Sequence, residues 1–246
     1  MFDYKMTSIG IIIQARMGST RLPSKIMLPI NGLPVLQYQI NRLKQFNPYI
    51  ILATTNKIQD LPVVDFATKN QLRYFRGSEN DVLNRYFECA DFFKLDVIIR
   101  ITSDCPLIDA DILQSAIKDY LDYNDSQLYL SNTIQRSFPR GFDFEIFSFS
   151  LLCEANKFAI SESDREHVTP YIWKNKSGKT KIKQIVRKED KSRYRLTLDT
   201  PEDLSLIKEL IERFEADKLS ENDIINILDN NPNIVAINSS VEQKKV

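Results

Sequence analysis

Apolar and polar residues follow two periods along the first half of the chain, one typical of buried strands and one typical of amphipathic helices. Short runs rich in Ile, Val and Leu fit strands, whereas longer runs with apolar residues three or four positions apart fit helices. Strands are expected at Ser8–Gln14, Tyr49–Thr54, Leu72–Phe75 and Asp96–Ile101, and helices at Pro34–Phe46, Leu61–Asn70, Glu79–Phe93 and Asp109–Tyr123. This alternation of strand and helix predicts right-handed crossovers and a mostly parallel sheet.

The second half is less regular and predicts an inserted or antiparallel portion of the sheet. Strands are expected at Leu128–Ser131, Phe142–Phe147, Lys181–Val186 and Tyr194–Leu198, and helices at Asp164–Lys174 (opened by Ser163), Pro201–Phe214 and Glu221–Asn230. No linker divides the chain, so we expect one α/β domain over residues 1–246. Its ordered core is expected at about 8–237, between a loose leader and a frayed tail at 238–246.

Three cations stand in the turn that follows the first expected strand. Gly18, Ser19 and Thr20 have little side-chain bulk, so backbone N–H groups in this turn can face a ligand. Arg16, Arg21 and Lys25 add forked and point positive charges, a combination that suits phosphate oxygens. The alternative is a solvated basic loop at the end of an edge strand. Neither the P-loop pattern nor the Gly-x-Gly-x-x-Gly dinucleotide fingerprint occurs in the chain.

Composition limits the other classes of function. Lys plus Arg and Asp plus Glu number 33 each, so no overall field attracts nucleic acid or an anionic membrane. No apolar run approaches the roughly 20 residues of a membrane span, and the N-terminus lacks a signal-peptide core, so a cytoplasmic location is the default expectation. Three cysteines far apart predict free thiols. Because His167 is the only histidine, chemistry must rest on carboxylates, cations and a hard metal ion.

Two aspartates follow expected strands directly. Asp104 comes just after Asp96–Ile101, at the sheet edge where ligands of open α/β sheets gather. Asp199 directly follows the segment Tyr194–Leu198. Residues 200–203 after it form a typical helix start, which a structural role alone explains. Mg²⁺ prefers a few carboxylates plus substrate phosphates, so such aspartates could hold it. The alternative for Asp104 is a cap on the turn before the next proline.

In these motifs the chain resembles the sugar nucleotidyltransferases, in particular the KDO and acylneuraminate cytidylyltransferases, and it looks closest to their spore-coat polysaccharide biosynthesis branch. The family pattern of Ala-Arg, a short Ser-containing turn, Arg-Leu-Pro, one residue and Lys is present at Ala15–Lys25, and Asp-Thr-Pro-Glu-Asp-Leu at Asp199–Leu204. The resemblance spans Ile11 to about Leu210. It implies a Rossmann-like, single-domain, three-layer αβα fold of the nucleotide-diphospho-sugar transferase type.

The same resemblance implies an enzyme that uses Mg²⁺ and CTP to activate an acidic sugar or a sugar 1-phosphate, with release of pyrophosphate, for surface polysaccharide or glycan biosynthesis. Asp104 and Asp199 would bind the metal ion, and both would act in catalysis with Arg16, Arg21 and Lys25. The residues expected to contact the nucleotide are Gln14, Ala15, Arg16, Gly18, Ser19, Thr20, Arg21, Lys25, Arg76 and Ser78.

Four further residues are expected beside the acceptor sugar. Asp143 and Glu145 lie in a stretch that the resemblance puts near that substrate, although an ordinary half-buried strand alternates in the same way. Arg165 and His167 lie on an expected helix, where a single histidine is usually structural. Ser78 has a structural alternative too, as a helix cap.

Other readings stay open at this stage. GTP and a sugar 1-phosphate could replace CTP and an acidic sugar, because nothing around residues 76–85 decides the base. A glycosyltransferase would also want Mg²⁺ at a strand end, but Ser103-Asp104-Cys105 supplies one acid where such enzymes usually have two. The third reading is a nucleotide-binding subunit without turnover. We expect a nucleotide and a small sugar as partners, neither nucleic acid nor membrane, and a homodimer by resemblance alone.

Overall fold

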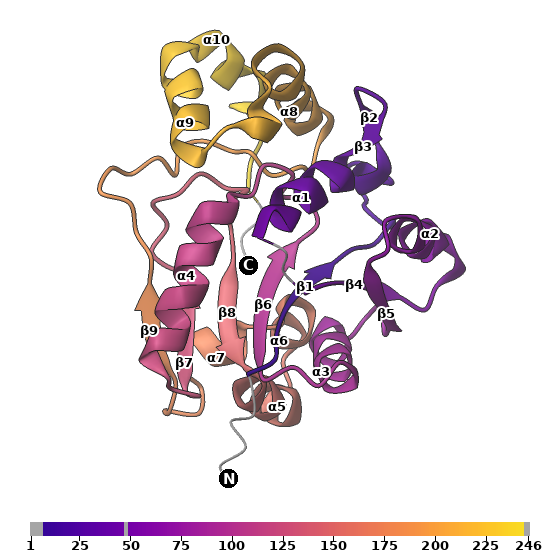
Figure 1. Ribbon diagram of the computed structural model, residues 1–246, viewed down its shortest axis with the longest axis vertical. Helices are drawn as coiled ribbons and strands as arrows, with labels where there is room; N and C mark the ends of the chain where they lie inside the picture. The colour runs from indigo at the N-terminus through magenta and orange to yellow at the C-terminus, as the bar shows by residue number, and fades with distance from the viewer. Residues whose placement is uncertain (1–6, 47–48, 244–246) are drawn as a thin grey trace.

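A seven-stranded sheet forms the centre of the computed structural model, which describes residues 7–46 and 49–243 (Figure 1). The strands are ordered β5-β4-β1-β6-β8-β7-β9 across the sheet. Their bounds are β1 Ile9–Gln14, β4 Ile50–Thr55, β5 Arg73–Gly77, β6 Val97–Thr102, β7 Leu128–Ser131, β8 Glu145–Ser148 and β9 Lys181–Gln184; a separate two-stranded sheet pairs β2 Pro29–Ile30 with β3 Leu33–Pro34.

Strand β8 is the one that runs against the rest of the large sheet. The β5-β4-β1-β6 part is parallel throughout, β8 is antiparallel to both β6 and β7, and β7 is parallel to β9. The predicted α/β class with a mostly parallel sheet and a small antiparallel portion is therefore confirmed. The parallel register brings the carboxyl ends of β1 and β6 together, since Gln14 pairs with Thr102.

Helices cover both faces of the sheet and one of its ends (Figure 1). Their bounds are α1 Val35–Leu43, α2 Leu61–Lys69, α3 Val82–Phe92, α4 Ala110–Tyr123, α5 Phe149–Phe158, α6 Glu162–His167, α7 Pro170–Trp173, α8 Pro201–Phe214, α9 Glu221–Asn230 and α10 Pro232–Val235. Short 3₁₀ helices add Lys25–Met27, Lys44–Phe46, Ile58–Asp60, Ala216–Lys218 and Ala236–Asn238.

The three consecutive isoleucines of β1, Ile11 to Ile13, explain how the layers assemble. Successive strand residues point to opposite faces, so Ile11 and Ile13 pack in one core with α1, α2 and α4, while Ile12 packs in the other with α3 and α5. All three isoleucines are fully buried, as expected for a central parallel strand. A third apolar cluster joins α8, α9 and α10 to α1 at the end of the sheet.

The helix predicted at Asp164–Lys174 is wrong in its start and in its continuity. Its first part, α6, is capped by Ser161, whose hydroxyl accepts the N–H of Asp164, and not by Ser163. A γ-turn then interrupts the helix: Val168 has a φ of 71°, and the N–H of Thr169 donates to the carbonyl of His167 at 2.8 Å. The chain resumes a helical course only at α7.

The segment Tyr194–Leu198 is extended but is not a strand of the sheet, so this prediction is also wrong. Its backbone bonds go to two different loops: Leu196 donates to Arg140 at 2.7 Å and Leu198 donates to Asp104 at 2.8 Å. A ladder with one neighbouring strand cannot form when the partner changes within four residues.

Two other differences concern the second half of the chain. The hydrophobic pattern assigns no element to residues 149–158, where helix α5 packs beside α3 and against β8 on the same face of the sheet. The tail was expected to fray from Asn238, yet this residue is buried and its amide donates to the carbonyl of Arg195 at 2.9 Å. Within the part of the chain that the structure describes, no helix is both long and apolar enough to cross a membrane.

Candidate active site

The turn that follows β1 is held in shape by the buried carboxylate of Asp60. One oxygen of Asp60 accepts the N–H of Met17 at 2.6 Å, and the other accepts the hydroxyl of Thr55. The N–H of Ser24 donates to the carbonyl of Met17 at 3.0 Å and closes the turn. Arg16, Gly18 and Thr20 are exposed along it, so the turn offers backbone and cationic groups to solvent.

Lys25 joins the two aspartates that the sequence assigns to a metal ion. Its Nζ lies 3.0 Å from Asp104 Oδ2, 2.8 Å from Asp199 Oδ1 and 2.7 Å from the carbonyl oxygen of Leu198. Burial by itself would lower the pKa of Lys25, but the carboxylates of Asp104 and Asp199 outweigh burial and raise this pKa above its usual value. The ammonium is therefore charged, and both carboxylates converge on it.

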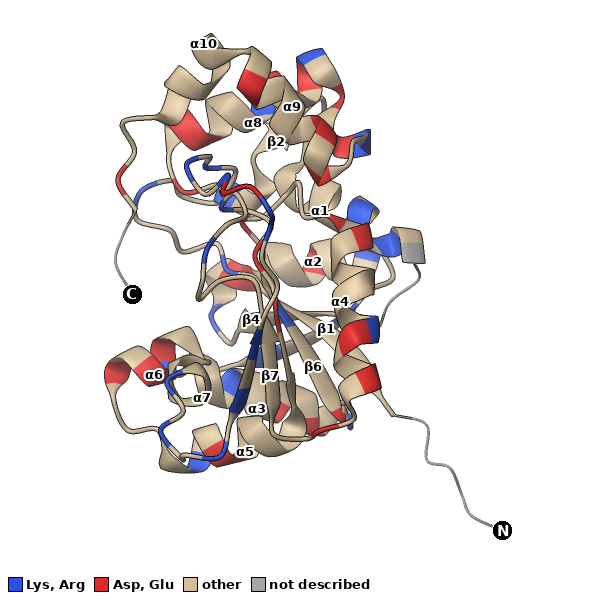
Figure 2. Ribbon diagram, turned by 90° about the vertical axis from the view of Figure 1, so that its left-hand side faces the viewer, with Lys and Arg blue, Asp and Glu red and all other residues tan. Residues whose placement is uncertain are grey.

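Two arginines bond the second carboxylate oxygen of Asp199. Arg21 Nη2 lies 3.0 Å and Arg195 Nη2 lies 2.9 Å from Asp199 Oδ2. Burial would raise the pKa of Asp199, but Lys25, Arg21 and Arg195 together lower it below its ordinary range. In Figure 2, basic and acidic residues lie close together on the loops between the sheet and the helices α8 to α10.

Asp104 is oriented by its neighbours in the turn after β6. Its Oδ1 accepts the hydroxyl of Thr102 at 2.5 Å and the thiol of Cys105, whose sulfur lies 3.7 Å away. Burial, together with the negative charge of Asp104, raises the pKa of the Cys105 thiol well above its ordinary value, so the sulfur keeps its proton and acts as a donor. Asp104 thus has its other oxygen, Oδ2, directed at Lys25.

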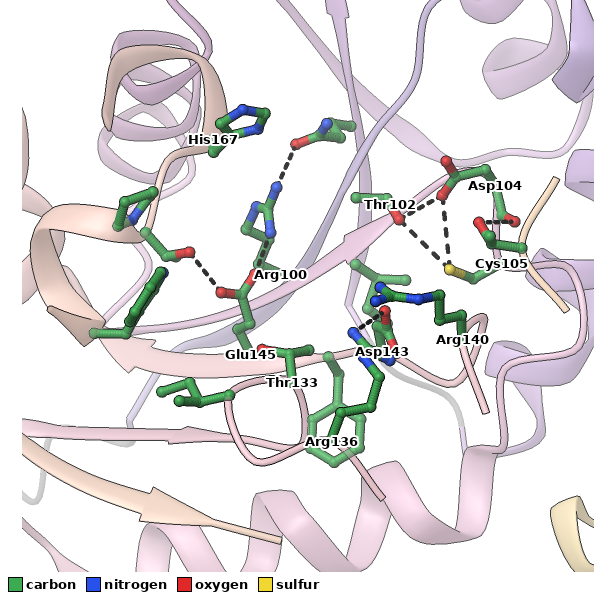
Figure 3. Close-up of a pocket in the computed structure, with 18 of the residues that line it drawn as sticks. Arg100, Thr102, Asp104, Cys105, Thr133, Arg136, Arg140, Asp143, Glu145 and His167 are labelled. Carbon is green, nitrogen blue, oxygen red and sulfur yellow. Dashed lines mark hydrogen bonds and ion pairs between the residues drawn. The ribbon is translucent and has the colours of Figure 1, made fainter. Parts of the chain in front are cut away.

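A cavity of about 880 Å³ opens beside these carboxylates (Figure 3). We call Asp104 and Asp199 with Lys25 its carboxylate end, and Arg100, Glu145 and His167 its far end; Figure 3 shows Asp104 and His167 on opposite sides of the residues drawn. Six residues singled out in the sequence line the cavity: Gln14, Asp104, Asp143, Glu145, His167 and Asp199.

Glu145 anchors the far end and is itself almost fully buried. One of its oxygens accepts the hydroxyls of Tyr129 and Thr169, each at 2.5 Å, and the other pairs with Arg100. Arg100 also donates to the side-chain oxygen of Gln14 at 3.2 Å. With both carboxylate oxygens bonded to protein donors, Glu145 fixes the wall of the cavity.

Asp143 and His167 also line the cavity and are more exposed than Glu145. Both oxygens of Asp143 bond the guanidinium of Arg136, at 2.7 and 3.0 Å. Burial lowers the pKa of His167, and the nearby charge of Arg100 lowers it further, so the imidazole is neutral near pH 7. His167 is presented by the γ-turn at Val168, which also directs Thr169 to Glu145.

Comparison with known proteins identifies the family. Residues 10–234 match the family profile described as cytidylyltransferase. The chain belongs to the cytidylyltransferase family. The predicted resemblance and the predicted enzyme class, a nucleotidyltransferase, are thus confirmed.

Relatives of this family resemble the chain over most of its length. It is 34% identical to the spore coat polysaccharide biosynthesis protein SpsF of Bacillus subtilis, over 92% of this chain and 96% of that protein. A solved cytidylyltransferase from Leptospira borgpetersenii is 38% identical, with a TM-score of 0.88, over 97% of this chain and 100% of that chain. A CMP:2-keto-3-deoxy-manno-octonic acid synthetase solved with CTP shares the fold, at a TM-score of 0.63 and 17% identity over 85% and 100% of the two chains.

Not every residue singled out in the sequence reaches the cavity of this cytidylyltransferase fold. Arg76 donates to the carbonyls of Thr55 and Lys57, and the hydroxyl of Ser78 accepts the N–H of Asp81. Arg165 pairs with Asp81, which is the cap of α3, so it ties α6 to α3. The alternative weighed for Ser78, a helix cap, is wrong, because Asp81 caps α3 and Ser78 only accepts the N–H of that cap residue. The bonds of Arg165 are structural ones within the protein.

The sequence analysis missed five residues that shape the site: Asp60, Arg100, Arg136, Arg140 and Arg195. Arg100 carried a usable signal, because a charge in the middle of the otherwise apolar run Val97–Ile101 needs a buried partner. Asp60 carried none, since it acts on Met17, which only the fold brings near. Arg195 lies four residues before its partner Asp199, but its position in an expected strand gave no reason to pair the two side chains. Within residues 7–46 and 49–243, no three His, Cys, Asp or Glu side chains gather as a ready-made metal site.

Proposed function

We propose that this protein is a Mg²⁺-dependent cytidylyltransferase of one domain that joins CTP to an oxygen of a sugar, releases pyrophosphate and supplies surface polysaccharide or glycan biosynthesis. One observation carries the proposal: Lys25, Arg21 and the two strand-end aspartates meet within hydrogen-bond distance at one end of a large cavity. We expect the reaction in the cytoplasm.

The cations supply the positions that a triphosphate needs. Lys25 and Arg21 are both held by ion pairs with Asp199, so each is already ordered before a nucleotide arrives. Arg16 is exposed on the adjacent turn and adds a third positive charge. Phosphoryl and nucleotidyl transfers rest mainly on positioning and charge stabilisation, and positioning can contribute about 7–11 kcal/mol to lowering a barrier. Such an arrangement needs no covalent intermediate and no histidine.

The residues at the carboxylate end fit Mg²⁺. Asp104 and Asp199 direct one oxygen each at the Lys25 ammonium, so Mg²⁺ would bind both oxygens only if Lys25 gives up these bonds for the phosphates. Hard carboxylate oxygens are the donors that Mg²⁺ takes together with substrate phosphates. We assign the ion to these two carboxylates. When bound, Mg²⁺ would neutralise negative charge that grows on the phosphates.

The part of the cavity between its two ends suits the sugar. Arg136 and Arg140 line it together with Asp143, and the apolar side chains of Ile134 and Trp173 border it. A sugar 1-phosphate would attack through a phosphate oxygen that is already ionised, so it would need no general base. An acidic sugar that attacks through a hydroxyl would have to give up the proton of that hydroxyl to a base or to water. The acceptor would attack the α-phosphate in line, while Arg21 and Lys25 orient the triphosphate.

The test is pyrophosphate release with each of the four NTPs, with and without Mg²⁺, against a panel of acidic sugars and sugar 1-phosphates. We expect a metal-dependent signal with CTP. Release with GTP alone would replace the proposal by a guanylyltransferase acting on a sugar 1-phosphate. Transfer from a preformed sugar nucleotide without pyrophosphate would instead indicate a glycosyltransferase, and CTP binding without turnover a non-catalytic subunit. Size-exclusion chromatography with light scattering tests the expected homodimer.

A further inference from the structure

Asp203 is a fully buried carboxylate with five donors. It accepts Arg195 Nε at 2.9 Å and Nη2 at 3.0 Å, and the amide of Asn238 at 2.9 Å. It also accepts the backbone N–H groups of Asp199 at 2.9 Å and Thr200 at 3.1 Å. A helix capping box explains only the bond to Thr200. The other bonds connect Asp203 to a residue of the proposed site.

Arg195 links Asp203 to the carboxylate end of the cavity. Its guanidinium lies between Asp203 and Asp199, and its Nη2 is 2.9 Å from Asp199 Oδ2. The backbone of Asp199 and its side chain are therefore fixed by the same pair, one by Asp203 directly and the other through Arg195. A group held on both sides in this way loses little freedom when it binds a ligand.

The C-terminal segment holds the pair in turn. Asn238 is buried, and its amide donates both to the carbonyl of Arg195 and to Asp203 Oδ1, each at 2.9 Å. Five residues later, the side-chain oxygen of Gln243 accepts Arg195 Nη1, and Gln243 also lines the cavity. The chain beyond α10 thus returns to the site and touches the guanidinium that orients Asp199.

We propose that Arg195 and Asp203 are positioning residues for Asp199, and that the segment Asn238–Gln243 is a working part of the site because it fixes both of them. The proposal rests on the proposed function only in the role given to Asp199. It predicts that substitutions in this segment impair turnover more than they impair binding of CTP, because the phosphate-holding Lys25 also bonds Asp104 and the carbonyl of Leu198, neither of which this segment touches.

Two substitutions test it. Asn238→Ala removes both amide bonds, and Gln243→Ala removes one acceptor of Arg195 at an exposed position where folding is not at stake. Gln243→Glu keeps an acceptor and should restore the wild-type behaviour, while Glu242→Gln, also exposed, is the matched control. We expect kcat to fall about tenfold in Asn238→Ala and about threefold in Gln243→Ala, with KM for CTP within about twofold of wild type.

Hydrogen–deuterium exchange of the peptide covering residues 195–203 provides the readout that does not need activity. The N–H groups of Asp199 and Thr200 should exchange several times faster in both alanine variants, and at the wild-type rate in Gln243→Glu and Glu242→Gln. The proposal would be overturned if the exchange rates and kcat are unchanged in Gln243→Ala and also in Asn238→Ala, provided that the latter folds. Absence of turnover in the wild type would overturn the proposed function, while the exchange rates would still decide the role of the segment.

Discussion

The two ends of the cavity use charge in different ways. At the carboxylate end, Lys25 bridges Asp104 and Asp199 with side chains that remain partly exposed, at 14, 22 and 16%. At the far end, Glu145 is 7% exposed and satisfied by three donors of the protein. An ion pair open to the cavity can be exchanged for a bond to ligand, whereas a buried and fully bonded carboxylate can only hold the wall. The carboxylate end can therefore exchange its ion pairs for bonds to a ligand, whereas Glu145 keeps the far end in shape.

The strongest way to test this contrast is to remove charge at the carboxylate end. Asp104→Asn and Asp199→Asn should each lower kcat about 10³-fold, because stabilisation of the transferring phosphate depends on these carboxylates. The midpoint of thermal unfolding should change little for Asp104→Asn, whose carboxylate is accessible. Near wild-type turnover of either variant at limiting Mg²⁺ would disprove the two-aspartate site.

Removing charge at the far end should instead affect folding. Glu145→Gln leaves the buried guanidinium of Arg100 without its counter-charge, so the free energy of unfolding should fall by about 3 kcal/mol or more. The matched control is Asp143→Asn, whose more open pair with Arg136 should contribute less than about 1 kcal/mol. Urea denaturation measures both, and equal losses would contradict the assignment of Glu145 to the scaffold.

A paired substitution separates the two substrates. Arg21→Ala should raise KM for CTP about tenfold and leave KM for the sugar unchanged, because Arg21 lies beside Asp199. Arg136→Ala should do the reverse, since Arg136 lines the cavity and pairs with Asp143, a residue expected beside the sugar. Initial rates over a matrix of both substrate concentrations give the two KM values. A rise of the same KM in both variants would show that Arg21 and Arg136 act on the same substrate.

His167 should give the smallest effect. His167→Ala should lower kcat less than about threefold, because the neutral imidazole is assigned no proton transfer. Since the folded state lowers the pKa of His167 below its ordinary value of 6.5, the unfolded chain binds the proton more readily, and this group costs stability as the pH falls below 6.5. The midpoint temperature of unfolding should therefore fall more between pH 7.5 and pH 5.5 for the wild type than for the variant. Complete loss of turnover in a folded His167→Ala variant would overturn the assignment of catalysis to carboxylates and cations.

The accuracy of the sequence analysis differs between regions for a physical reason. The crossovers from β1 to α4 and the helices α8 and α9 were predictable because each buries its own periodic apolar face. The errors at α6 and at Tyr194–Leu198 have another origin. At Tyr194–Leu198 the backbone bonds distant partners, such as Leu198 to Asp104, which no local pattern records. At the end of α6 the backbone makes a γ-turn, and the hydroxyl of Thr169 bonds the distant Glu145.

The sequence by itself determined the parallel α/β fold and the family, and it predicted the two aspartates with Lys25 and Arg21 as site residues, because strand periodicity and short motifs are local. Only the tertiary structure decided that Lys25 lies between Asp104 and Asp199, that Arg100 needs Glu145, and that the C-terminal segment returns to Arg195. These contacts join residues far apart along the chain. Their energy depends on burial and on the distance between charges, and both exist only once the sheet and its helices have assembled.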